Sequence, residues 1–272
     1  MFDEQRLDDF VEMLWDFYAH SKRADLPWRQ PDDAGHFDPY KIMVSELMLQ
    51  QTQVSRVVPK YEQFLQLFPT DQALGEADLG DVLRAWQGLG YNRRAKFLWQ
   101  AAQVIRANGV FPTTLSELVK LPGIGQNTAG AILAYAYNEP TLFVETNVRS
   151  VYIHHFFAHQ DAITDKQIME VLAVTLDHEN PREFYWALMD YGSHLKTVTG
   201  NAARASKHYA KQSTFKGSRR QIRGQVLRTL GAATTTLLEL QQTISDDRLP
   251  SVLADLQSEG LIHVRADGAY SL

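Results

Sequence analysis

The sequence contains no cysteine among its 272 residues. The chain therefore forms no disulfide, holds no zinc through thiolates and ligates no iron–sulfur cluster through cysteine. It also lacks an apolar run near the roughly 18–20 residues that a membrane span needs. Its first ten residues are acidic and amphipathic, unlike a secretory signal peptide. We therefore expect an intracellular protein in a reducing compartment, with no membrane partner.

Acidic residues are absent from one long stretch. Between Tyr191 and Leu238 there is no aspartate or glutamate, although the whole chain has 32 acidic and 27 basic residues and a net charge of −5. This segregation of charge predicts a local positive surface that a polyanion can use. The alternative is a solvated basic stretch with no partner. The stretch holds nine basic residues: Lys196, Arg204, Lys207, Lys211, Lys216, Arg219, Arg220, Arg223 and Arg228.

Apolar residues recur at helical spacing along most of the chain and predict an all-α fold. The first stripe covers residues 10–18, and the same spacing is found in 39–53, 55–68, 79–87, 91–107, 126–137, 146–157, 165–177 and 181–195. Glycines and prolines separate these segments. Alternation with period two occurs only near the end, where residues 261–265 and 269–272 flank Asp267 and Gly268, as in a β-hairpin.

A second apolar pattern follows a polar stretch at residues 199–217. It starts at Ile222, continues to Leu256 and ends in the predicted hairpin. Three helices followed by a two-stranded wing, in about 55 residues, are typical of a winged-helix module. We therefore expect a main domain at residues 1–212 and a small winged-helix-like module at residues 213–272.

The segment KLPGIGQ at residues 120–126 is the sharpest local motif. Pro122 ends one helix, and Gly123 and Gly125 let the backbone turn with its N–H groups exposed. The helix that opens at Gln126 adds the positive end of its dipole, so the motif is suited to bind a phosphate. The P-loop and dinucleotide patterns do not fit, because the required lysine and the preceding strand are missing. A plain corner between two helices is the alternative.

Four segments together carry a resemblance to a known family. They are LPWRQ at 26–30, DPYKIMVSELMLQQTQV at 38–54, AWQGLGYNRRAKFL at 85–98 and LPGIGQNTAGAILAYA at 121–136. They resemble the helix-hairpin-helix (HhH-GPD) DNA glycosylases, and among these the MutY adenine glycosylases, from about residue 26 to residue 195. The resemblance implies two helical lobes with the substrate base flipped into the cleft between them. It implies a monomer acting on double-stranded DNA with a mispaired or damaged base, in the bacterial cytoplasm or nucleoid.

In the family, the glutamate of the SE-x-MLQQT motif is the general acid, and here that residue is Glu46. It is a lone charge among the apolar residues of 44–49, so partial burial would keep a proton available for the purine. An exposed helix glutamate without a catalytic role is the alternative.

The second carboxylate of the family is an aspartate, which Glu145 replaces in the segment VETNVR at 144–149. The resemblance implies that it stabilises the cationic sugar, with Asn147 supporting it. Glu145 is one methylene longer than aspartate, and a displacement of about 1 Å can slow a reaction by about a hundredfold. The alternative is that Glu145 only complements the dipole of the helix starting near Thr146.

Asn127 occupies the position where bifunctional relatives carry a nucleophilic lysine. Asparagine forms no Schiff base, so we expect no strand cleavage. Gln51 matches the residue that fills the gap left by the extruded base. The resemblance also assigns DNA binding to residues of the hairpin motif: Leu121, Gly123, Gly125, Gln126 and Thr128.

The chain departs from the family in its cofactor and its C-terminal part. The four cysteines of the family's iron–sulfur cluster would fall near Lys196, Ala203, Ser206 and Gln212. We expect no cofactor except, at most, a monovalent cation at the hairpin. We also expect no other metal site, because the adjacent His154 and His155 point to different faces of a helix. The resemblance also implies a C-terminal domain that reads 8-oxoguanine, and we expect this chain to lack it.

Three functions compete. The first is a monofunctional glycosylase that removes adenine opposite 8-oxoguanine or guanine. The second is a glycosylase that removes thymine or uracil from mismatches with guanine, and the MLQQTQV match favours adenine over it. The third is a catalytically impaired DNA-binding protein, which the replacement at Glu145 and the lack of the cluster cysteines favour.

Overall fold

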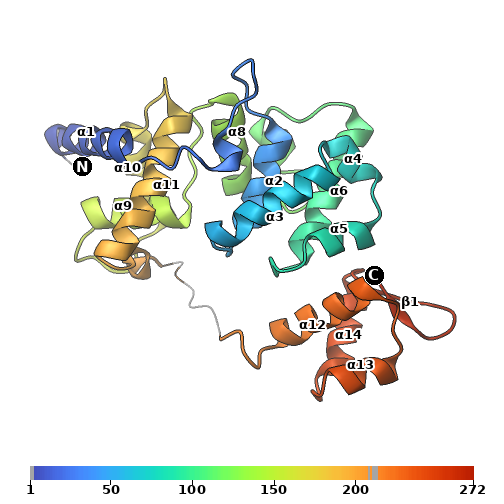
Figure 1. Cartoon of the computed structure of the whole chain (residues 1–272). Coiled ribbons are helices and arrows are strands. Elements are labelled where there is room, and N and C mark those ends of the chain that lie inside the picture. Colours follow the sequence, from blue (N-terminus) through green and yellow to red (C-terminus); the bar gives the residue numbers. More distant parts are fainter. Residues whose placement is uncertain (1–2, 208, 210–213) are drawn as a thin grey trace. The chain divides into compact units, whose positions relative to one another are not determined.

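A computed structural model describes residues 3–207, 209 and 214–272, and helices dominate it (Figure 1). In these residues the chain forms fourteen α-helices, two 3₁₀ helices and one two-stranded sheet. The predicted all-α fold is confirmed. Among the described residues, no helix is both long and apolar enough to cross a bilayer.

The chain forms two compact units, and each draws on separate parts of the sequence. Unit 1 consists of Met1–Ile42, Thr113–Lys120 and Ile124–Lys211. Unit 2 consists of Met43–Pro112, Leu121–Gly123 and Gln212–Leu272. Within the described residues, the change from one unit to the other falls within helix α2 (Pro39–Leu49), between Pro112 and Thr113, and on either side of Leu121–Gly123 after helix α7 (Leu115–Leu118).

Aromatic packing and a buried ion pair hold unit 1 together. Phe10 lies 5.4 Å from the ring of Tyr152 and 5.0 Å from that of Phe156. The guanidinium of Arg29 donates to both carboxylate oxygens of Asp190, at 2.8 Å each. The helices of unit 1 besides α7 are α1 (Glu4–Ser21), η1 (Pro27–Arg29), α8 (Gln126–Tyr137), α9 (Thr146–Phe156), α10 (Asp165–Thr175), α11 (Pro181–Val198) and η2 (Ala202–Ala205).

Unit 2 begins with the end of α2 and continues with four helices, and the side chains of Phe64, Trp86 and Leu98 in this part are fully buried. The structure differs from the predicted helices here mainly in two places. Helix α4 was not predicted, and α2 ends at Leu49 rather than at residue 53, while the other ends differ by at most two residues. The first helices of this unit are α3 (Val54–Leu67), α4 (Asp71–Glu76), α5 (Leu79–Ala85) and α6 (Arg93–Asn108).

The C-terminal part of unit 2 has the predicted winged-helix-like organisation. Helices α12 (Arg219–Ala232), α13 (Leu237–Thr243) and α14 (Leu249–Ser258) precede an antiparallel pair of strands, β1 (His263–Val264) and β2 (Tyr270–Ser271). Gly268 turns the hairpin with φ +79°. Val226, Val252 and Leu256 are fully buried in this part.

This module contacts the rest of unit 2. Helix α12 packs on α5, and Arg220 at the start of α12 donates to the hydroxyl of Tyr91 at 2.7 Å. Lys96 of α6 donates to the carbonyl oxygen of Glu259. The expected domain boundary at residues 212 and 213 lies outside the described residues, as does Lys211 of the basic stretch. The division at that point stays a prediction.

Candidate active site

Glu46 is the acidic side chain of α2 and lies in unit 2, where it is half-buried. Its neighbours in sequence, Ser45 and Leu47, are each 1% exposed, and Val44 and Met48 are fully buried. Partial burial penalises a charged carboxylate relative to the neutral acid. The half-buried position of Glu46 therefore suits a proton donor.

Gln51 follows α2 in the left-handed backbone region, with φ +55°. Its side chain is exposed. The turn is closed by the N–H of Thr52, which donates to the carbonyl of Leu49 at 3.1 Å. Left-handed φ values are uncommon outside glycine and occur often at functional sites. The residue predicted to fill the gap in DNA thus lies on a strained, exposed turn directly after the helix of Glu46.

The hairpin motif joins α7 to α8 through a turn that needs glycine. Gly123 has φ +77°, and a Cβ atom there would lie 2.5 Å from Cβ of Phe97. No other residue fits that position without moving α6. Leu121 and Ile124 on either side of the glycine are each 4% exposed, so they anchor the turn rather than face solvent. The DNA contact of Leu121 stays a prediction.

Helix α8 begins at the hairpin with an exposed end. Its N-cap is Gly125, and no side chain caps the first turn. Gly125 and Gln126 are exposed, Thr128 is half-buried, and the space beside Gly125 is open. Backbone N–H groups and the positive end of the helix dipole are therefore accessible to an anion.

In unit 1, an extended segment at residues 141–144 leads to Glu145. The hydroxyl of Tyr185 donates to the carbonyl of Thr141 at 2.7 Å and accepts from the N–H of Phe143 at 3.2 Å. The rings of Phe143 and Tyr185 stack at 3.9 Å. Thr141 also donates through its hydroxyl to the carbonyl of Gly130 at 2.8 Å. The segment is thus fixed between α8 and α11.

Asn127 holds the last residue of this segment. Its Nδ2 donates to the carbonyl of Val144 at 3.0 Å, and its Oδ1 accepts from the N–H of Val144 at 3.3 Å. Arg149 donates to the same carbonyl at 3.3 Å and pairs with both carboxylate oxygens of Asp165 at 2.8 and 2.9 Å. The residue at the position of the family's lysine therefore fixes the backbone just before Glu145.

Glu145 is half-buried and is the N-cap residue of α9. Its side chain makes no capping hydrogen bond, so hydrogen-bonded capping is not its role. Asn147, the second residue of α9, donates to the carbonyl of Met189 in α11 at 3.3 Å. A Cβ atom on Gly192 would lie 2.7 Å from the carbonyl oxygen of Asn147, so α9 and α11 are in close contact here. Asn147 thereby anchors the start of α9.

The predicted residues thus fall into two groups, each organised within its own unit. Unit 1 brings Asn127, Glu145 and Asn147 together around the start of α9, and unit 2 holds Glu46 and Gln51 on α2 and its turn. Sequence reasoning missed two buried arginines, Arg29 and Arg94, which are each 7% exposed. Nothing in their local sequence indicates burial.

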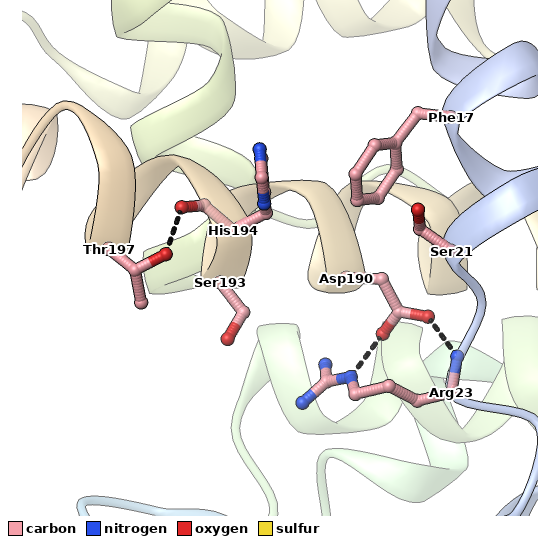
Figure 2. A pocket seen from close by; sticks show the side chains of 7 residues that line it. All are labelled: Phe17, Ser21, Arg23, Asp190, Ser193, His194 and Thr197. Carbon is pink, nitrogen blue, oxygen red and sulfur yellow. Dashed lines mark hydrogen bonds and ion pairs between the residues drawn. The ribbon is translucent and has the colours of Figure 1, made fainter.

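A cavity of about 250 Å³ in unit 1 lies between α1 and α11 (Figure 2). No predicted site residue lines it. At its edge Asp190 accepts from Arg23 and from Arg29. Burial raises the pKa of Asp190, but the hydrogen bonds and charges of the two arginines outweigh it, and the net pKa is lowered. The lining residues are Phe17, Ser21, Arg23, Asp190, Ser193, His194 and Thr197.

The residues at the family's cluster positions do not fit an iron–sulfur group. Lys196, Ala203 and Ser206 offer no thiolate, and Gln212 lies outside the described residues. Ala203 is 3% exposed, and the N–H of Ile163 donates to the carbonyl of Ala205 at 3.1 Å. Across the described residues no group of histidine, aspartate and glutamate is arranged to hold a metal.

Comparison with known proteins identifies relatives of the whole chain. The family model for HhH-GPD superfamily base excision DNA repair proteins matches residues 44–177. The adenine DNA glycosylase of Mycolicibacterium smegmatis is 34% identical over 294 residues, which cover 96% of this chain and 95% of that protein. The adenine DNA glycosylase of Buchnera aphidicola subsp. Baizongia pistaciae is 36% identical over 190 residues. That match covers 68% of this chain and 52% of the relative, so the chain spans about half of its length.

A solved structure of a thermostable thymine-DNA glycosylase has the same fold. It superimposes with a TM-score of 0.59 at 22% identity, over 70% of this chain and 87% of that one. At this identity the likeness concerns the fold and not the base removed.

Proposed function

This chain belongs to the adenine DNA glycosylases of the HhH-GPD superfamily of base excision repair proteins, and on that basis we propose that it removes mispaired adenine from DNA without cutting the strand. The proposal rests on one observation above the others, the 34% identity to an adenine DNA glycosylase over 96% of this chain and 95% of the relative. The proposed substrate is duplex DNA with adenine opposite 8-oxoguanine or guanine.

Two carboxylates divide the proposed chemistry. Glu46 donates a proton to the purine, which turns a poor leaving group into a good one. As the N-glycosidic bond breaks, the charge of Glu145 stabilises the sugar, which carries positive charge in the transition state. Water then adds to the sugar, and the products are the free base and an abasic strand.

The proposed activity stops at the abasic site because Asn127 has no amine. The carboxamide of Asn127 is also engaged on both sides by the backbone of Val144. A Schiff base, which strand cleavage by β-elimination needs, cannot form at this residue.

The exposed start of α8 is the proposed contact with the DNA backbone. The accessible N–H groups near Gly125 and Gln126 suit a phosphate oxygen, and these contacts fix the protein's register without reading sequence. Gln51, exposed on its turn, is the proposed occupant of the space left by the extruded base.

A panel of duplexes tests the proposal. Each duplex carries one adenine, thymine or uracil opposite 8-oxoguanine or guanine, and alkali treatment reveals abasic sites. We expect cleavage only at adenine and only after alkali. Trapping with borohydride is expected to give no protein–DNA adduct. Excision of thymine or uracil instead of adenine would support the second function, and no excision from any duplex would support the impaired binding protein.

A further inference from the structure

Arg94, the second residue of α6, is a buried cation that no catalytic step above uses. Its side chain makes six hydrogen bonds in the described part of the chain, and all of them end on backbone carbonyls or a hydroxyl. Burial lowers its pKa to about 10, so the guanidinium stays charged at neutral pH. Burying a charge costs free energy unless hydrogen bonds compensate it. The position of Arg94 is therefore a guide to what its hydrogen bonds do.

One nitrogen of Arg94 binds the end of α2. Nη1 donates to the carbonyls of Leu47 at 2.6 Å, Met48 at 3.1 Å and Gln50 at 2.5 Å. The last carbonyls of a helix have no partner within the helix, and a cation there also opposes the negative end of the dipole. Arg94 therefore ends the helix that carries Glu46.

The other nitrogen binds the loop that leads to Tyr91. Nη2 donates to the carbonyls of Leu89 at 3.3 Å and Gly90 at 3.1 Å, and to the hydroxyl of Thr52 at 3.2 Å. The ring of Tyr91 lies 5.4 Å from the guanidinium carbon. One planar group thus joins the turn after α2 to the loop before α6.

Among the described residues of unit 2, two residues other than glycine have a left-handed backbone, Gln51 and Tyr91. Each follows a residue whose carbonyl accepts from Arg94, which is Gln50 in the first case and Gly90 in the second. Gln51 has φ +55° and Tyr91 has φ +47°. The angle φ of a residue is measured from the peptide plane that holds the carbonyl of the preceding residue. A hydrogen bond to that carbonyl therefore restrains φ. Arg94 therefore holds two strained residues in place at once. The side chain of Gln51 is exposed, and that of Tyr91 is 36% exposed.

From this geometry we propose that Arg94 is a positioning residue for base extrusion. It acts through Gln51 and Tyr91, which it presents as one rigid pair to the DNA, and it touches no reacting atom. The proposal rests on the proposed base excision, because only an enzyme that flips its substrate needs such a pair.

The first test compares Arg94→Lys with Arg29→Lys. Both arginines are 7% exposed, but Arg29 pairs with Asp190 in unit 1. A lysine at 94 keeps the charge, but its three hydrogens lie on one nitrogen, which cannot bind both turns as the two guanidinium nitrogens do. The probe is a duplex with 2-aminopurine in place of the target adenine, whose fluorescence rises on unstacking. We expect Arg94→Lys to slow that rise at least about tenfold and Arg29→Lys to leave it unchanged.

A second duplex separates positioning from general damage to the fold. Here the 2-aminopurine lies opposite an abasic site, so less pairing has to be broken. We expect the defect of Arg94→Lys to shrink to less than about threefold on this duplex. An equal defect on both duplexes, or an extrusion rate equal to wild type on the first, would overturn the proposal.

Thr52→Val provides a variant of nearly equal size that leaves the buried arginine in place. It removes the hydroxyl that accepts from Arg94 and donates to the carbonyl of Leu89 at 3.4 Å. We expect extrusion to slow by about twofold to fivefold, and an unchanged rate counts against the proposal. The fluorescence reports extrusion without excision. A protein that unstacks 2-aminopurine but releases no adenine would contradict the proposed function and leave the role of Arg94 standing.

Discussion

Glu46 in unit 2 and Glu145 in unit 1 are held in place by different means. Glu46 lies inside a helix, and the residues on either side of it are almost fully buried. Glu145 lies just before a helix, at the end of an extended segment that hydrogen bonds fix at Thr141, Phe143 and Val144. Packing of its neighbours fixes the backbone at Glu46, and hydrogen bonds fix the backbone just before Glu145.

The two surroundings also favour different forms of a carboxyl group. Both side chains are half-buried, which disfavours charge, but Glu145 lies at the start of α9, where the positive end of a helix dipole favours charge, whereas Glu46 lies inside α2. Enzymes that need both a proton donor and an anion place two carboxylates in such contrasting environments. The difference between the regions thus agrees with the division of roles proposed above.

Glu46→Gln should have the largest effect on the rate. The amide fills the same space but donates no proton of comparable acidity, and general acid catalysis contributes about a hundredfold to ten-thousandfold. Single-turnover excision from an adenine:8-oxoguanine duplex measures the loss, and binding to an abasic duplex should be unchanged. Glu62→Gln, on the exposed face of α3, is the matched control. Retention of more than about a tenth of the wild-type rate would exclude Glu46 as the acid.

Glu145→Gln should have the next largest effect, about a hundredfold, because it removes the charge that stabilises the sugar. Glu145→Asp should equal or exceed the wild type, since it restores the shorter side chain of the family. The exposed Glu139→Gln is the control. If neither substitution changes a measurable rate, Glu145 only complements the dipole of α9. If the wild type is inactive on every mispair and Glu145→Asp gains activity, the chain is a disabled glycosylase.

The sequence predicts the helices and turns within each region better than the contacts that these elements make within the same unit. The start of α8 at Gln126, the end of that helix and the hairpin at Gly268 agree with the prediction, because periodicity, glycine and proline act locally. The half-buried position of Glu46 also follows from its apolar neighbours. These features depend on residues a few positions apart.

What the sequence does not predict depends on distant residues. Helix α2 ends at Leu49 because Arg94 binds its last carbonyls, and no glycine or proline marks that end. The bonds of Asn127 to Val144 likewise form only when α8 packs beside the extended segment. Helix α4 is six residues long, too short for its apolar spacing to stand out.

Asn127→Ala tests whether hydrogen bonds position Glu145. It removes both bonds to Val144, and we expect excision to slow by about tenfold. If Asn127 acts through Glu145, its effect should largely vanish in a Glu145→Gln background, which a double-mutant cycle measures. Additive losses in that cycle would mean that Asn127 serves the fold or the DNA independently of the carboxylate.

Arg149→Lys should have the smallest effect. Lysine retains a positive charge near Asp165, but it cannot pair with both carboxylate oxygens and also reach the carbonyl of Val144. Asn127 still holds Val144 on both sides, so the segment keeps its main anchor. The Arg149 and Asp165 side chains are 14% and 27% exposed, so the cost in folding should stay near 1 kcal/mol. We expect excision to slow by about twofold to threefold, with a small fall in the melting temperature. A loss as large as that of Asn127→Ala would show that the arginine, rather than the asparagine, is the main support of Glu145.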